Sequence, residues 1–386
     1  MPVARNRRIY TLYIYYALCF IATGMTTYAP KYYGEIGLFD SQIGIISAVA
    51  ALLALAAQPV WGILADRARY KRSVLAIGLL MSGLMCFLVP AASTRFIRLL
   101  AVLTLYSIFQ LPAIPVANAI SLEYTQATGH RFGPVRMMGT IGYQVGILAT
   151  GFFLSQSLYG LYPAMGAMLL LTAASALLLP PVRGHQRDRD RISFAPLFKN
   201  RSLLLLFAFA FIGHIGHQFN LVFFSKHLGD LGIDNTVTGI INTLSVVLEI
   251  PFLIFGDRIM KYKSIWSWLV VGMIVGAIRF ILLSVLNAPV WIVMIQMLSI
   301  AHFACFEFFP FIYLGKAAGK ELQASAQSMY QMITFGFARI VASLLGGAIA
   351  DITGISTVYL LSGLLMAVAV PAFFFPMRKL AQSERG

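Results

Sequence analysis

The sequence consists mainly of apolar runs, each about 20 residues long and bounded by charged or turn-forming residues. A run of ~20 apolar residues is the length that a helix needs to cross the hydrocarbon core of a membrane. Of the 386 residues, 59% are hydrophobic and only 11% are charged, more apolar surface than a soluble domain of this length can bury. We predict an all-α membrane protein with twelve spans, whose approximate cores are 10–30, 42–64, 73–92, 99–120, 135–156, 161–180, 202–224, 237–256, 265–286, 290–313, 324–350 and 356–376.

Lysine and arginine are distributed unevenly between the two sides of this arrangement. With the N-terminus in the cytoplasm, 23 of the 29 lie on the cytoplasmic side and four on the outer side; Arg279 and Arg339 lie inside spans. The positive-inside rule therefore predicts a multi-pass protein of the cytoplasmic (inner) membrane with both termini in the cytoplasm. Topology also accounts for the net charge of +15, so we predict no nucleic-acid partner.

The chain divides into two similar halves. A polar segment separates them, which predicts an N-terminal half at 1–182, a cytoplasmic linker at 183–201 and a C-terminal half at 202–386. The sequence DSQIGIISAVAALLALAAQP (40–59) resembles NTVTGIINTLSVVLEIP (235–251), and each copy is followed by an Asp-Arg pair. Two duplicated six-helix halves are a transporter architecture, with the substrate site at the interface between the repeats.

The segment after the first copy carries a family motif. WGILADRARYKR (61–72) resembles the G-x-L-x-D-R-x-G-R-[K/R]-[R/K] loop between the second and third helices of the major facilitator superfamily, although Arg69 replaces a glycine. FGDRIMKYK, after the second copy, keeps only the Asp-Arg pair and a basic tail. The resemblance implies the major facilitator fold, two pseudo-symmetric six-helix halves, and cytoplasmic gating contacts that latch the two halves through Asp66, Arg67, Asp257 and Arg258.

Shorter motifs resemble the proton symporters of the lactose, nucleoside and phenylpropionate permease type. These motifs are RFGPVRMMGTIGY (131–143), LEIP (248–251), QML (296–298) and FEFFPF (306–311). The resemblance implies that Glu307 is the proton site and that Arg279 is its partner. The sequence departs from the lactose branch at Asn118, where that branch has an acid, and in the five-residue separation of His302 from Glu307.

Polar residues inside the predicted spans need a reason, because an ionisable side chain there costs ~2.5–3.5 kcal/mol on insertion scales. Helical spacing aligns several of them on common faces, which we interpret as the walls of a water-filled cleft. The alternative is hydrogen bonding between neighbouring helices, which holds the bundle together. The candidates for substrate binding are Asn118, Arg136, Tyr143, His217, Asn220 and Asn242.

Glu307 is the main candidate for proton coupling. Burial among phenylalanine side chains favours a protonated carboxyl, whereas an approaching arginine favours the ionised form. Pro310 lacks an N–H, which leaves the Phe306 carbonyl without its helical donor and weakens the helix there. Two alternatives stay open, a permanent Glu307–arginine pair and Glu249 as the proton carrier. The full set is Glu307, Glu249, Arg279, Arg339 and His302.

Three histidines suggest further interpretations. Regular α-helical spacing places His302 about 140° around the helix from Glu307, at ~100° per residue, which favours a structural role. A metal site of His214, His217 and Glu249 would suggest an intramembrane metalloenzyme, but the H-E-x-x-H motif is absent. We therefore predict no enzyme activity, no metal and no cofactor, with the proton as coupling ion.

The predicted function is proton-coupled uptake of a small polar solute, such as a sugar or a nucleoside, by a monomeric transporter in the lipid bilayer. The alternatives are a drug or metabolite efflux antiporter and a non-transporting receptor or scaffold of the same fold. A glycine stripe of Gly139, Gly142 and Gly146 predicts close packing of the fifth span on a neighbour. It lacks the G-P-x-x-G-G pattern of drug/proton antiporters, which disfavours efflux.

Overall fold

The computed structural model describes residues 3–183, 200–247, 264–317 and 319–383, together with residues 259 and 262. All regular structure in these residues is helical, as the long apolar runs predict. The α-helices are α1 (Val3–Met25), α2 (Ala29–Glu35), α3 (Asp40–Arg67), α4 (Lys71–Ala92), α5 (Phe96–Gln110), α6 (Ala113–Thr128), α7 (Phe132–Phe153), α8 (Leu161–Leu177), α9 (Arg201–Asp230), α10 (Asn235–Val247), α12 (Ile265–Val285), α13 (Pro289–Met297), α14 (Ser299–His302), α15 (Phe309–Ala317), α16 (Gly319–Gln331), α17 (Ala338–Thr353) and α18 (Ile355–Ser383).

Most of the predicted spans coincide with long apolar helical stretches. In the described part of the chain, nine such stretches are long and apolar enough to cross a membrane. The sixth predicted span is the shorter apolar helix α8, and the fifth and eighth spans fall on α7 and α10. The all-helical membrane architecture is confirmed, whereas the count of twelve spans stays a prediction.

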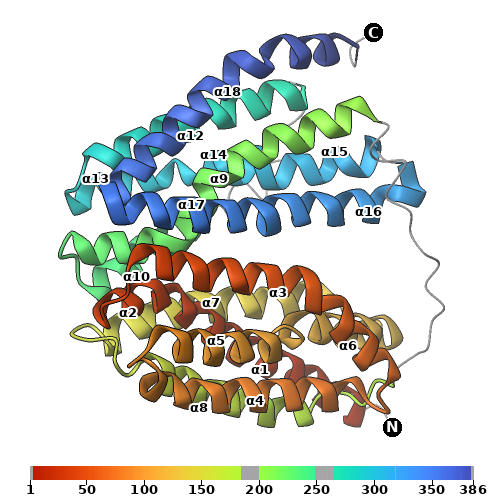
Figure 1. Ribbon diagram of the computed structural model, residues 1–386. Coiled ribbons are helices and arrows are strands. Elements are labelled where there is room, and N and C mark those ends of the chain that lie inside the picture. Colours follow the sequence, from red (N-terminus) through yellow and green to blue (C-terminus); the bar gives the residue numbers. More distant parts are fainter. Residues whose placement is uncertain are drawn as a thin grey trace. The chain divides into compact units, whose positions relative to one another are not determined.

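The chain forms two compact units, drawn in Figure 1 as bundles of long helices. Unit 1 contains Met1–Leu38, Leu52–Asp188 and Asp234–Gly239. Unit 2 contains Phe39–Ala51, Arg189–Ile233 and Ile240–Gly386. Most of the linker that we predicted at 183–201 lies outside the described residues, so its boundaries stay a prediction.

Each unit includes one helix start from the opposite half of the sequence. The first part of α3 belongs to unit 2, and the first part of α10 belongs to unit 1. These two segments begin the repeated sequences DSQIGII and NTVTGII. The internal repeat therefore marks the two places where a helix start packs with helices of the other half of the chain.

Close packing of α7 on α1 explains the glycine stripe. A Cβ atom on Gly142 would lie 2.5 Å from the Ala17 carbonyl oxygen, and one on Gly146 would lie 2.3 Å from that of Ile21. Real Cβ atoms do not approach carbonyl oxygens so closely, so only glycine permits this contact. The predicted packing role of the stripe is thus confirmed.

A single methyl group at this contact should destabilise unit 1. We expect Gly146→Ala to lower the melting temperature of the detergent-solubilised protein, because overpacking that moves backbone costs ~1–3 kcal/mol. Gly133→Ala is the matched control on α7, because its added Cβ meets nothing within 4 Å. Equal melting temperatures for the two variants would show that α1 and α7 do not depend on this contact.

Candidate functional site

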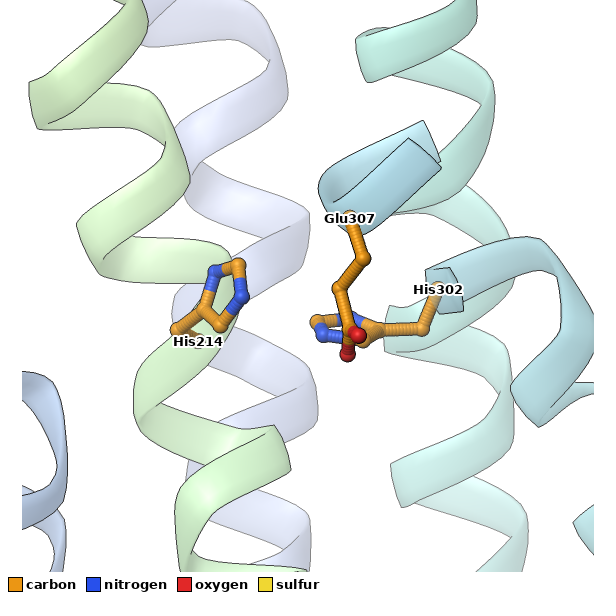
Figure 2. Close-up of side chains that lie close together, drawn as sticks. All are labelled: His214, His302 and Glu307. Atoms are coloured by element: carbon orange, nitrogen blue, oxygen red, sulfur yellow. The ribbon is translucent and has the colours of Figure 1, made fainter. Parts of the chain in front are cut away.

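Three histidines and a carboxylate gather in the middle of unit 2. His214 and His217 lie on α9, His302 ends α14, and Glu307 lies in the π-helical segment Phe303–Phe308. The side chain of His214 is 0% exposed and that of His302 is 2% exposed. Figure 2 shows His214 facing His302 and Glu307 across the gap between their helices.

The π-helical segment brings His302 and Glu307 together. One ligand atom from each of His214, His302 and Glu307 lies within 4.8 Å of the other two. The separation of about 140° that we expected for His302 and Glu307 assumed ~100° per residue, which does not hold here, and the role of His302 stays a prediction. A π-helix bonds residue i to i+5, so residues five apart lie closer together around the axis than in an α-helix.

Pro310 and Tyr330 account for the irregular helix beside Glu307. Pro310 cannot donate a hydrogen bond, so the carbonyl of Phe306 needs another donor. The buried hydroxyl of Tyr330 on α16 donates to this carbonyl oxygen. The predicted weak point in the helix is therefore present, and a side chain from another helix satisfies its freed carbonyl.

His217 lies against both His302 and Glu307. Its ring stacks on that of His302 with a centroid separation of 3.9 Å and an interplanar angle of 12°. Its Nε2 atom lies 3.8 Å from Oε1 of Glu307. The sequence grouped His217 with substrate binding, and the structure places it beside the proton-coupling candidates.

The two intramembrane arginines have different partners. Arg279 on α12 is 1% exposed, and its Nη2 donates to Oε1 of Gln296 at 2.7 Å. The Nε atom of Arg339 donates to Ser47 Oγ on the first part of α3 at 3.2 Å. Gln296 was missing from the predicted site residues, although it belongs to the QML motif that resembles the symporters.

The remaining unit 2 candidates have a more structural setting or lie outside the described residues. Asn220 is 4% exposed and accepts a hydrogen bond from the Tyr359 hydroxyl at 3.2 Å. Asn242 is half-buried on α10. Glu249, Asp257 and Arg258 lie outside the described residues, so their predicted roles stay predictions.

A charged network at the start of α3 escaped the sequence reasoning. The Asp351 carboxylate accepts hydrogen bonds from the backbone N–H groups of Asp40 at 2.6 Å and Ser41 at 3.1 Å. Lys226 pairs with Asp40 at 3.0 Å and with Asp230 at 2.8 Å. These residues stand at the ends of predicted spans, where charge is expected, so nothing in their spacing indicates that they belong together.

Three substrate candidates in unit 1 lie on α6 and α7, two of them linked through α1. The Tyr16 hydroxyl donates to Oδ1 of Asn118 at 2.6 Å, and its ring stacks on that of Phe20. The guanidinium of Arg136 lies 4.7 Å from the centroid of the Phe20 ring. On the same helix as Arg136, the Tyr143 hydroxyl lies 3.2 Å from Thr27 Oγ1.

The predicted gating loop is tied to unit 1 in this structure. Lys71 is 5% exposed, pairs with Asp66 at 3.6 Å and forms a hydrogen-bonded ion pair with Glu123. Arg72 donates to the Leu179 carbonyl oxygen at 2.8 Å, and Arg67 is exposed at the end of α3. These contacts of Lys71 and Arg72 lie within unit 1, and the predicted gating role of Asp66 and Arg67 stays a prediction.

Comparison with known proteins identifies the family. The model of the MFS_1-like family matches residues 9–361. This chain belongs to the MFS_1-like family, within the major facilitator superfamily. The predicted superfamily is therefore confirmed, and the chain is a membrane transporter rather than an enzyme.

Individual relatives cover nearly the whole chain. An uncharacterized transporter of Bacillus subtilis, YwbF, is 27% identical over 91% of this chain and 89% of its own. The maltose permease of Geobacillus stearothermophilus is 26% identical over 92% of this chain and 91% of its own. The crystal structure of the nucleoside transporter NupG matches with a TM-score of 0.83 at 20% identity, covering 96% of this chain and 98% of NupG. This structural match confirms the predicted fold class.

Proposed function

We propose that this MFS_1-like transporter couples the uptake of a small polar solute to the inward movement of a proton at Glu307. The observation that carries the proposal is the convergence of Glu307 with His217 and His302 inside unit 2. A carboxylate inside a membrane span costs ~2.5–3.5 kcal/mol on insertion scales, so its presence favours a functional role. Its side chain is 26% exposed, which leaves it accessible to a proton.

A proton carrier needs one state in which its carboxyl is ionised and one in which it is protonated. A nearby positive charge favours the ionised state of Glu307. Arg279 lies on α12, which packs against α14 and the π-helical segment that carry His302 and Glu307. Gln296 holds the guanidinium of Arg279 in place through a 2.7 Å hydrogen bond. We propose that this positive charge stabilises ionised Glu307, whereas its apolar neighbours favour the protonated form in another stage of the cycle.

The energetic gain from one proton is large enough for accumulation. A charge that moves across ~100 mV supplies ~2.3 kcal/mol. Every ~1.4 kcal/mol is a tenfold change in a concentration ratio. One proton per solute therefore supports roughly fifty-fold accumulation of a neutral substrate.

The proposed substrate is a sugar or a nucleoside. Named relatives include a maltose permease and a nucleoside permease, whose substrates share several hydroxyl groups. Asn118, Arg136, Tyr143, Asn220 and Asn242 carry the side-chain groups that we propose for hydrogen bonding to such hydroxyls. We propose the cytoplasmic membrane as the location, with cytoplasmic termini, because of the 23-to-four distribution of basic residues.

A thermal-shift screen of purified protein tests the substrate class. A ligand that binds only the native state stabilises it by ~2.7 kcal/mol at 100 times its Kd. We expect a sugar or a nucleoside to raise the melting temperature, with aromatic acids as the comparison set. Stabilisation by aromatic acids alone would contradict the proposed substrate class.

Asn118→Ala should weaken binding of the solute found in that screen by about tenfold, because a lost hydrogen bond is worth ~0.5–1.5 kcal/mol. Asn287→Ala is the control, since this asparagine is exposed between α12 and α13. Binding is measured by titration calorimetry on both purified variants. An unchanged Kd for Asn118→Ala would remove this residue from the substrate site.

A further inference from the structure

The His214–His302–Glu307 cluster has the composition of a metal site. Two imidazoles and one carboxylate each offer a ligand atom, and these atoms lie within 4.8 Å of one another. They come from α9, from α14 and from the π-helical segment, so they reach one point from two sides, as Figure 2 shows. Metal binding by this cluster is therefore a property distinct from proton coupling, and the two can be tested separately.

A backbone hydrogen bond leaves a lone pair of His214 directed into the cluster. Its Nδ1 atom lies 2.9 Å from the carbonyl oxygen of Ala210, one turn earlier on α9. A carbonyl oxygen only accepts, so Nδ1 carries the proton and Nε2 carries the lone pair. Metal-ligating histidines commonly show this arrangement, in which the other ring N–H donates to a carbonyl oxygen.

Both histidines present a ring nitrogen that the rest of the described structure does not satisfy. Nε2 of His214 and Nε2 of His302 are buried and have no hydrogen-bond partner among the described residues. Both side chains are almost fully buried, at 0% and 2% exposure. Burying an unpaired polar atom costs free energy, and two such atoms in one cluster point to a shared ligand.

The donor set selects the class of ion. Two histidines and one glutamate are a known ligand set for Zn²⁺ with an open fourth position. Mg²⁺ and Ca²⁺ prefer oxygen ligands, so imidazole nitrogens disfavour them. Bonds of ~2.0–2.1 Å need ligand atoms roughly 3.3 Å apart, so the three side chains, now within 4.8 Å of one another, would draw together around a bound ion.

We propose that His214, His302 and Glu307 bind a transition-metal dication of the Zn²⁺ class, and that the bound ion blocks transport. Glu307 ligates as a carboxylate, so a protonated Glu307 releases its proton to solvent when the metal binds. The metal and the proton therefore exclude each other at this side chain. The binding site goes beyond the proposed function, and only the block of transport rests on proton coupling at Glu307.

Cobalt titration of the purified full-length protein tests the site, with Co²⁺ as a spectroscopic substitute for Zn²⁺. The protein for this titration is to be purified through an affinity tag without histidine, so that the tag does not bind Co²⁺. We expect saturable binding of one Co²⁺ per chain, visible d–d absorption of a low-symmetry site, and loss of that absorption on adding Zn²⁺ but not Mg²⁺. His302→Ala and the conservative variant Glu307→Gln should each weaken Co²⁺ binding at least tenfold.

His227→Ala is the matched control. His227 is also a buried histidine on α9, at 3% exposure, and it lies 13 positions after His214. Its ring lies against Tyr359 and not against the cluster. Its replacement should leave Co²⁺ affinity unchanged. Absence of saturable Co²⁺ binding, or equal affinity in wild type, His302→Ala and Glu307→Gln, would overturn the metal site.

Zn²⁺ inhibition of solute uptake tests the consequence separately. We expect micromolar Zn²⁺ to inhibit wild-type uptake and to inhibit His302→Ala at least tenfold less potently. If Co²⁺ binds as predicted but uptake proves independent of protons, the proposed coupling fails while the metal site stands. Zn²⁺ inhibition of equal potency in both proteins would overturn the proposed block.

Discussion

Glu307→Gln is expected to abolish accumulation of the solute against a gradient while leaving exchange across the membrane intact. The glutamine amide keeps the size of the side chain but cannot take up or release a proton. Exchange of internal for external solute needs no net proton movement, so it should continue. The expected loss is the whole proton-driven gradient, roughly fifty-fold at ~100 mV. Uptake and counterflow of radiolabelled solute in proteoliposomes measure both properties on one preparation.

Glu35→Gln is the matched control for this substitution. Glu35 ends α2 in unit 1, where its carboxylate accepts a hydrogen bond from the backbone N–H of Leu158 at 2.9 Å. Glutamine retains an acceptor oxygen, so accumulation should continue. Wild-type accumulation by Glu307→Gln would place the proton elsewhere, with Glu249 as the next carboxylate to replace.

Gly44→Ala is expected to slow transport at least tenfold without a comparable loss of solute binding. A Cβ atom on Gly44 would lie 2.1 Å from the carbonyl oxygen of Ser343 on α17, so backbone must move to admit it. Overpacking of this kind costs ~1–3 kcal/mol, and a rate falls tenfold for every ~1.4 kcal/mol. We propose that the start of α3 leaves and rejoins α17 during alternating access. Initial uptake rates at equal protein incorporation, together with calorimetric Kd values, measure the effect.

Gly160→Ala is the control, since Gly160 lies outside the motifs assigned to gating and proton coupling. Its added Cβ would meet only Leu154 Cδ2, the end of a flexible side chain, at 3.2 Å, so the substitution should leave the uptake rate unchanged. The contact at Gly44 lies beside the network of Asp351, Asp40 and Lys226, which fixes the start of α3 in unit 2. Equal uptake rates for Gly44→Ala and wild type would show that transport does not depend on this contact.

The sequence was most informative where one physical requirement dominates. The length of the apolar runs predicts membrane helices, and the comparisons confirm the superfamily that WGILADRARYKR suggested. The repeat DSQIGII/NTVTGII indicated a duplication. It did not show that each of these two helix starts belongs to the compact unit of the other half of the chain. That exchange depends on contacts far apart in the chain, such as the packing of Gly44 on Ser343.

Part of the site could not be predicted, because the spacing of residues in the sequence does not show where a helix changes from α to π geometry. The angular estimate separated His302 from Glu307, and the π-helical segment at Phe303–Phe308 reverses that result. The hydrogen bond from Arg279 to Gln296 joins α12 to α13, and the sequence alone does not indicate this pairing. Glu307 itself stood out in the sequence, because an acid in an apolar run has few structural explanations.

Proton movement on substrate addition tests the central claim most directly. De-energised vesicles that contain the wild-type transporter receive the solute identified by thermal shift, and the external pH is recorded in weakly buffered medium. Symport predicts a transient alkalinisation as solute and protons enter together, and Glu307→Gln should give no such change. External acidification would indicate antiport, and entry of solute with no pH change would show that the transporter does not use protons.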